Sequence, residues 1–114
     1  MGEPPVHLRV AAAAQRLGAA HGNVWLVVGA ARDASSIKAI RSVAPDAGCL
    51  IPGVGAQGGD LSAALAAAGP NVMINATRSI IYAAPHRDQL VQAARSEAES
   101  MLAAMRDAID FQNL

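Results

Sequence analysis

The stretch LIPGVGAQGGD, from Leu50 to Asp60, decides the fold, because it joins an apolar run to a glycine-rich turn and then to a residue that can cap a helix. Gly53, Gly55 and Gly58 have the spacing G-x-G-x-x-G. Backbone N–H groups in such a turn, at the N-terminus of a helix, point outward together and suit a phosphate oxygen. The spacing alone is a weak signal, since a strand-to-helix turn that needs positive φ selects the same glycines. The stretch therefore indicates a strand, a turn and a helix.

Strand and helix patterns alternate on both sides of this stretch. A leading amphipathic helix is predicted over residues 6–20, and the strand at 24–28 is apolar throughout, which is typical of a parallel strand buried on both faces. Ser35 or Ser36 can cap the helix that follows. The remaining predicted elements are strands at 48–51 and 71–75, a helix that Asp60 caps and Gly69 ends, and a long helix over 90–109. One leading helix and three βα units predict an α/β fold with parallel strands and a ligand at their C-terminal ends.

Composition limits the classes of function. The 114 residues form one domain, 1–114, and 53% hydrophobic with 16% charged residues is typical of a globular chain. The formal net charge is zero and the arginines are dispersed, so neither nucleic acid nor a membrane is an expected partner. Cys49 is the single cysteine and is expected to be buried, and Trp25 and Tyr82 are expected in the core. Without a signal-peptide pattern the chain is predicted to be cytoplasmic.

Two interpretations of the glycine loop remain open. A dinucleotide site would require an acidic residue after the next strand, where Asn75 to Arg78 has none; a basic residue there would suit a 2′-phosphate, so an NADP-binding βαβ fragment is the alternative. In a closed (β/α)₈ barrel, phosphate lies between the loops after the last two strands. Gln57 would then supply an amide donor, while Thr77 and Arg78 supply backbone N–H groups and a guanidinium. The three histidines are far apart in the sequence, and no metal site is predicted.

Three blocks resemble a known family. LVVGAA (Leu26 to Ala31), LIPGVGAQGGD and INATRSIIYA (Ile74 to Ala83) are similar, in this order and spacing, to the last three strands of orotidine 5′-phosphate decarboxylase, particularly its bacterial branch. The resemblance implies the C-terminal part of a (β/α)₈ barrel that converts orotidine 5′-monophosphate to uridine 5′-monophosphate and carbon dioxide without cofactor or metal. It implies phosphate binding by Gln57, Thr77 and Arg78, with Pro52 and Val54 beside the pyrimidine.

The family's catalytic signature, D-x-K-x-x-D, does not occur in these 114 residues, and the single lysine, Lys38, lies in a predicted surface helix. We therefore expect no decarboxylation by this chain alone. A binding module for phosphate or a nucleotide, without turnover, is the alternative function. Three strands cannot close a barrel, so we expect a homo-oligomer or association with the missing N-terminal half.

Overall fold

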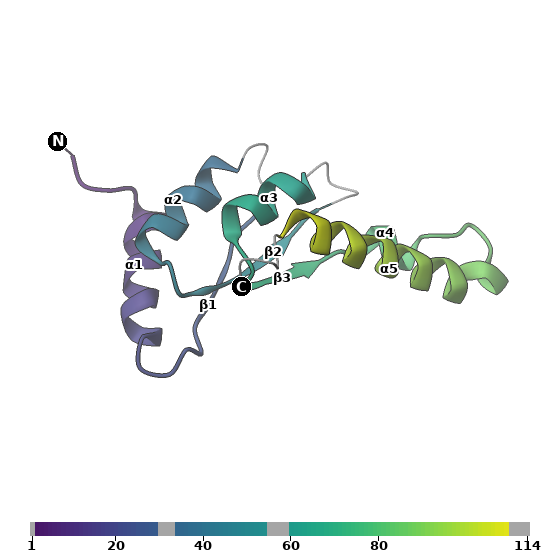
Figure 1. Cartoon of the computed structure of the whole chain (residues 1–114), viewed down its shortest axis with the longest axis horizontal. Coiled ribbons are helices and arrows are strands. Elements are labelled where there is room, and N and C mark those ends of the chain that lie inside the picture. Colours follow the sequence, from purple (N-terminus) through teal and green to yellow (C-terminus); the bar gives the residue numbers. More distant parts are fainter. Residues whose placement is uncertain (1, 30–33, 55–59, 110–114) are drawn as a thin grey trace.

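The computed structural model describes residues 2–29, 34–54 and 60–109. Its elements follow the predicted alternation of one leading helix and three βα units, which confirms the α/β fold (Figure 1). The order is α1 (Val6–Gly18), β1 (Trp25–Val27), α2 (Ser35–Val43), β2 (Gly48–Pro52), α3 (Leu61–Ala68), β3 (Val72–Asn75), α4 (Arg78–Ile81), the 3₁₀ helix η1 (Arg87–Gln89) and α5 (Leu90–Ala108).

The strands form one parallel sheet in the order β1-β2-β3. Leu26 pairs with Cys49 across the first ladder, and Cys49 pairs with Val72 across the second. Parallel neighbours require a crossover, and α2 and α3 provide the two crossovers between these strands. The C-terminal ends of all three strands therefore lie at the same end of the sheet.

The main core lies between one face of the sheet and the helices α2 and α3. Cys49 and Ile51 of β2 are fully buried and pack in one cluster with Ile37 of α2 and Ala64 of α3. Small alanines let α3 approach the sheet closely, which explains how a short helix can bury so much of its surface. The prediction that Cys49 is buried is confirmed, and burial raises the pKa of its thiol.

The opposite face of the sheet has no helix on it among the described residues. Trp25 and Val27 of β1 and Met73 of β3 are 41%, 72% and 55% exposed on this face. The prediction that the first strand is buried on both faces is therefore wrong: a run of apolar residues also fits a strand with one open apolar face. Tyr82, at 76% exposure, is likewise not in the core.

The helix boundaries follow the capping residues closely. The Asp60 side chain accepts a hydrogen bond from the backbone N–H of Ala63, as predicted for the N-cap of α3. Gly69 ends α3 with φ of +77°, a conformation that favours glycine. By contrast, α2 begins at Ser35 itself, and Ala34 is the N-cap residue. The prediction that Ser35 or Ser36 is the N-cap is therefore wrong, by one residue in the case of Ser35.

Arg41 of α2 connects the C-terminal ends of α2 and α3 with the N-terminal ends of β2 and β3. Its Nε donates to the carbonyl oxygen of Ala68, at the end of α3, at 2.6 Å, and its Nη2 donates to Asn71, just before β3, at 3.3 Å. Its Nη1 donates to carbonyl oxygens between α2 and β2, those of Ala44, Pro45 and Ala47. One guanidinium thus joins α2, β2, α3 and β3 at the sheet edge opposite to that where the strands end.

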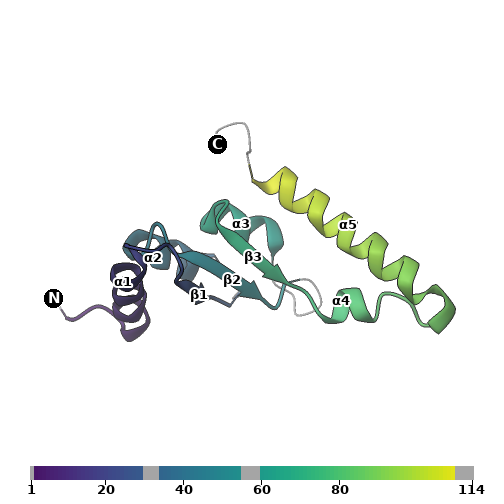
Figure 2. The same cartoon turned by 90° about the horizontal axis from the view of Figure 1, so that it is seen from below.

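The segment from α4 to α5 extends away from the sheet, with η1 at its far end (Figure 2). It gives the molecule an elongated shape of 56 × 31 × 23 Å. α5 returns toward α3, and Ile109, just beyond α5, is buried. In the described part of the chain, no helix combines the length and the hydropathy that a membrane span would need.

Candidate functional site

A cavity of about 220 Å³ opens where β2 and β3 end. Its lining comes from the last residue of each strand and the segment that follows it: Pro52, Gly53 and Val54 on one side, and Asn75, Ala76, Thr77, Arg78 and Ser79 on the other. The parallel register brings the two segments together, because Pro52 pairs with Asn75 at the last position of the β2–β3 ladder. A ligand in this cavity would therefore touch both loops.

The β2 side of the cavity is apolar and rigidly held. Gly53 has φ of +80°, so the chain can turn sharply at the end of the strand. Val54 is buried and belongs to the same core cluster as Ile51, which fixes the wall of the cavity to the main core. This side offers van der Waals contact to a ligand and no side-chain charge.

The β3 side of the cavity carries the polar groups. The Thr77 hydroxyl donates a hydrogen bond to Oδ1 of Asn75 at 3.2 Å, and both residues are exposed. Arg78 follows as the first residue of α4 and is also exposed. Among the described residues of the lining, Arg78 is the one charged side chain, so this end of the sheet is electropositive.

Ser79 adds a hydroxyl at the base of this loop. Its Oγ is buried, and it has no hydrogen-bond partner among the described residues. A buried hydroxyl without a partner carries a free-energy cost of about 1–3 kcal/mol, and such groups are few in folded proteins.

The predicted site residues converge, as far as the structure describes them. Pro52, Val54, Thr77 and Arg78 all line this one cavity, although they come from two loops more than twenty residues apart in the sequence. Gln57 lies outside the described residues. Their roles in binding remain predictions.

Two further polar residues of the lining, Asn75 and Ser79, are not among the site residues predicted from the sequence. Asn75 is the last residue of β3, and a polar residue at the C-terminal end of a parallel strand is a signal that could have identified it. For Ser79 the signal is weaker, because its burial depends on tertiary packing.

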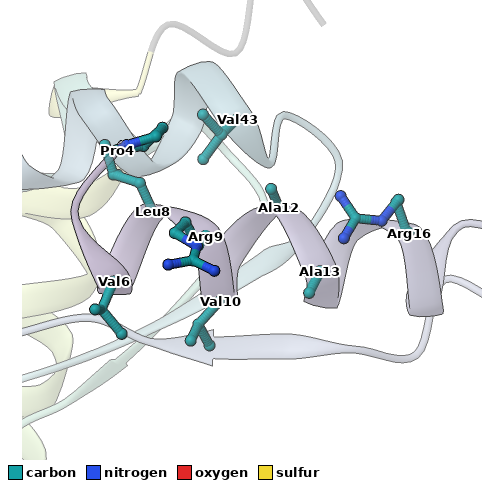
Figure 3. A pocket seen from close by; sticks show the side chains of 9 residues that line it. All are labelled: Pro4, Val6, Leu8, Arg9, Val10, Ala12, Ala13, Arg16 and Val43. Atoms are coloured by element: carbon teal, nitrogen blue, oxygen red, sulfur yellow. The ribbon is translucent and has the colours of Figure 1, made fainter. Parts of the chain in front are cut away.

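A larger hollow of the described part lies elsewhere, along α1 (Figure 3). It has a volume of about 610 Å³ and a mostly apolar lining that includes Val6, Val10 and Val43, with Arg9 and Arg16 as its charged residues. It contains no carboxylate, hydroxyl, thiol or imidazole that could act in catalysis. We therefore place the candidate site at the strand ends.

Groups for acid–base or metal chemistry are not gathered in the described part of the chain. Lys38 is exposed on α2, as predicted. Nor do three or more histidines, cysteines or carboxylates among these residues lie close enough together to hold a metal ion. The charge that Arg78 brings to the lining suits the candidate site to an anion.

Comparison with known proteins agrees with this geometry. The chain is 40% identical over 110 residues to orotidine 5′-phosphate decarboxylase of Delftia acidovorans, and 43% identical over 110 residues to that of Roseiflexus castenholzii. These alignments cover 94% and 93% of this chain. The chain resembles orotidine 5′-phosphate decarboxylase. It spans only about two fifths of these relatives, 39% and 38% of their lengths. No model of a protein family matches it.

Solved structures of a UMP synthase and of an OMP decarboxylase share the fold. The chain is similar to a structure of Leishmania donovani UMP synthase, with a TM-score of 0.69 and 34% identity, over 92% of this chain and 23% of that one. It is also similar to Leishmania donovani OMP decarboxylase, with a TM-score of 0.67 and 31% identity, over 92% and 40% of the two chains. The three parallel βα units thus match one part of a larger decarboxylase fold, and the prediction of a partial barrel is confirmed.

Proposed function

We propose that residues 1–114 form the C-terminal part of an orotidine 5′-phosphate decarboxylase barrel and bind the phosphate group of its substrate. The whole barrel would convert orotidine 5′-monophosphate to uridine 5′-monophosphate (UMP) and carbon dioxide, a step of pyrimidine biosynthesis. The observation that carries the proposal is the cavity at the ends of β2 and β3, which Thr77 and Arg78 line from one loop and Pro52 and Val54 from the other.

Phosphate binding would depend mainly on the β3 side of the cavity. The Arg78 guanidinium can donate two parallel charge-assisted hydrogen bonds to phosphate oxygens. Backbone N–H groups of Thr77 and Arg78 would add donors, because the first N–H groups of a helix such as α4 have no acceptor within the helix. Gln57 would close the site with its amide. Pro52 and Val54 would border the pyrimidine.

The size of the cavity supports a site for a phosphate group rather than for a complete nucleotide. Ligand pockets usually have volumes of about 300–1,000 Å³, and this one has about 220 Å³. The remaining part of a nucleotide would lie beside Pro52 and Val54, at the C-terminal ends of the strands. In a complete barrel, other strands would enclose that part of the ligand.

Turnover would need groups that this chain does not contribute. The signature D-x-K-x-x-D does not occur in its 114 residues, and Lys38 is exposed on α2. We expect the isolated chain to be inactive, and to bind nucleotide monophosphates or phosphate without turnover. Mixing it with the N-terminal half of a related decarboxylase, and following the loss of orotidine 5′-monophosphate by absorbance, tests the enzyme proposal. A stable assembly without turnover would leave only the binding function.

Calorimetric titration with UMP tests the binding proposal directly. Replacing Arg78 by Ala removes a charge-assisted contact worth about 1.5–3 kcal/mol, so the affinity should fall tenfold or more. Arg87→Ala is the matched control, because Arg87 is exposed in η1 and does not line the cavity. Equal affinities of the parent and Arg78→Ala would contradict the proposal. Binding of NADP in place of UMP would favour the dinucleotide alternative.

The open face of the sheet supports association with another chain. Val27 and Met73 expose apolar surface there, and β1 and β3 are edge strands of the described sheet. We expect either a homo-oligomer or a complex with the missing N-terminal half. Light scattering that gives a monomer mass at micromolar concentration would contradict self-association.

A further inference from the structure

We infer that Asn75 is a further ligand-binding residue of the cavity, and that its amide group donates a hydrogen bond to the bound phosphate. The Thr77 hydroxyl acts as a positioning group that orients this amide. The inference rests on the proposed phosphate site. It adds the Asn75 amide as an uncharged hydrogen-bond donor and the Thr77 hydroxyl as the group that orients it.

Asn75 lines the β3 side of the cavity, next to the β2 side. It is the last residue of β3 and pairs with Pro52 on β2, and both residues line the cavity. Thr77, two residues further on, lines the same cavity. Asn75 is exposed, so its amide is accessible to a ligand that enters between the two loops.

The hydrogen bond between Thr77 and Asn75 decides which end of the amide faces the ligand. The Thr77 Oγ1 donates to Asn75 Oδ1 at 3.2 Å, which occupies the carbonyl oxygen of the amide. Among the described residues, the Asn75 side chain forms no hydrogen bond besides this one. The NH₂ end, with its two protons, is therefore the end that remains available for a ligand oxygen.

The same bond excludes a direct role of the Thr77 hydroxyl as a donor to the anion. A hydroxyl has one proton, and this proton points to Asn75. Thr77 would then contact phosphate through its backbone N–H alone, while its side chain holds the amide of Asn75. The donor, Asn75, and the residue that orients it, Thr77, would thus lie two residues apart at the end of β3.

Substitutions of Asn75 test the donor by calorimetry with UMP and with inorganic phosphate. Asn75→Ala should weaken both ligands about 10-fold or more, since it removes a hydrogen bond to a charged group. Asn75→Asp keeps the shape and the acceptor for Thr77 but replaces the donor by a negative oxygen, and should weaken both at least about 10-fold by repulsion. Asn71→Ala is the matched control: Asn71 precedes the same strand at its other end and bonds the Asp46 carbonyl oxygen, so the affinities should not change.

Substitutions of Thr77 separate positioning from general structure. Thr77→Val removes the hydroxyl but keeps the size, and should weaken UMP about 2- to 5-fold when Asn75 is present. In the Asn75→Ala background the same change should have no further effect, because the hydroxyl then has no amide to orient. Thr77→Ser keeps the hydroxyl and should restore the parent affinity.

Several outcomes would overturn the inference. If Asn75→Ala and Asn75→Asp bind UMP like the parent while Arg78→Ala binds weakly, the phosphate site stands and Asn75 is not part of it. If Asn75→Ala weakens UMP but leaves inorganic phosphate unchanged, the amide contacts another part of the nucleotide and the phosphate contact is wrong. If Thr77→Val weakens binding equally with and without Asn75, its role is independent of the amide. If the parent binds neither ligand, the inference fails together with the proposed function.

Discussion

Replacing Arg41 should destabilise the chain more than replacing any exposed arginine. Its guanidinium donates to five backbone carbonyl oxygens at the N-terminal ends of β2 and β3 and the C-terminal ends of α2 and α3. Three of these hydrogen bonds, to Ala44, Ala47 and Ala68, are partly buried. In an alanine variant these carbonyl groups would lose their donor in places that water reaches poorly.

The expected loss in the free energy of unfolding follows from the number of independent hydrogen bonds that Arg41 forms. The bonds to Ala44, Pro45 and Ala47 share Nη1, which has two protons, and the bond to Asn71 is exposed. We therefore count two strong contacts, one from Nε and one from Nη1. At about 1.5 kcal/mol for a partly exposed bond to a charged group, Arg41→Ala should lower the free energy of unfolding by about 3 kcal/mol. Arg41→Lys keeps the charge without the planar fork, and should lose about half of this.

Urea unfolding at constant m-value measures both changes. Arg95→Ala is the control: its pair with Glu99 is 2.8 Å long, but the side chains are 72% and 63% exposed, and such a pair contributes about 0.3–0.5 kcal/mol. If Arg41→Ala does not fold, Arg41→Lys still gives a value. A loss below about 0.5 kcal/mol for Arg41→Ala, equal to the control, would refute the count of bonds.

Three further predictions concern the packing and the caps. Gly48→Ala would place a Cβ 2.3–2.5 Å from the Trp25 ring, so it should cost about 1–3 kcal/mol and change the fluorescence of the single tryptophan; parent-like unfolding and emission would contradict the overlap. Asp60→Ala removes the side-chain bond to Ala63 and should cost about 1 kcal/mol in urea unfolding, with Asp60→Asn close to the parent; an equal loss in both variants would contradict capping. Because burial holds the pKa of Cys49 above its ordinary value of 9.0, the unfolded chain ionises first as the pH rises, so the free energy of unfolding should fall above pH 9.0. Cys49→Ala should reduce this decline, and urea midpoints that do not change with pH in the parent would contradict it.

Much of the fold could be predicted from the sequence because its signals are local. Asp60 and Gly69 mark the two ends of α3 by chemistry that acts over a few residues, and the structure has them there. The open face of the sheet could not be predicted in this way. Val27 is apolar whether a helix, another strand or water lies above it, so its 72% exposure depends on elements that are not local to it.

The sequence could predict which residues come together at the site, because the C-terminal ends of parallel strands meet at the same end of the sheet. Pro52 and Asn75 end neighbouring strands, and the fold therefore brings Val54, Thr77 and Arg78 to one cavity. The orientation of the Asn75 amide could not be predicted, because it depends on a side-chain bond to Thr77. The bonds of Arg41 were missed for the same reason: their acceptors are main-chain groups, which no residue type reveals.

The two ends of the sheet place different chemical groups around an arginine. At the end where β2 and β3 begin, carbonyl oxygens point outward from the strands and from the helix ends, and Arg41 satisfies them. At the other end, the loop after β3 borders a cavity, and Arg78 adds a positive charge to its lining. A cation surrounded by carbonyl oxygens stabilises the fold, whereas an exposed cation beside a cavity can form charge-assisted hydrogen bonds to an anion. Arg41 and Arg78 have the same side chain, so it is the sheet direction that makes one structural and makes the other a candidate for binding.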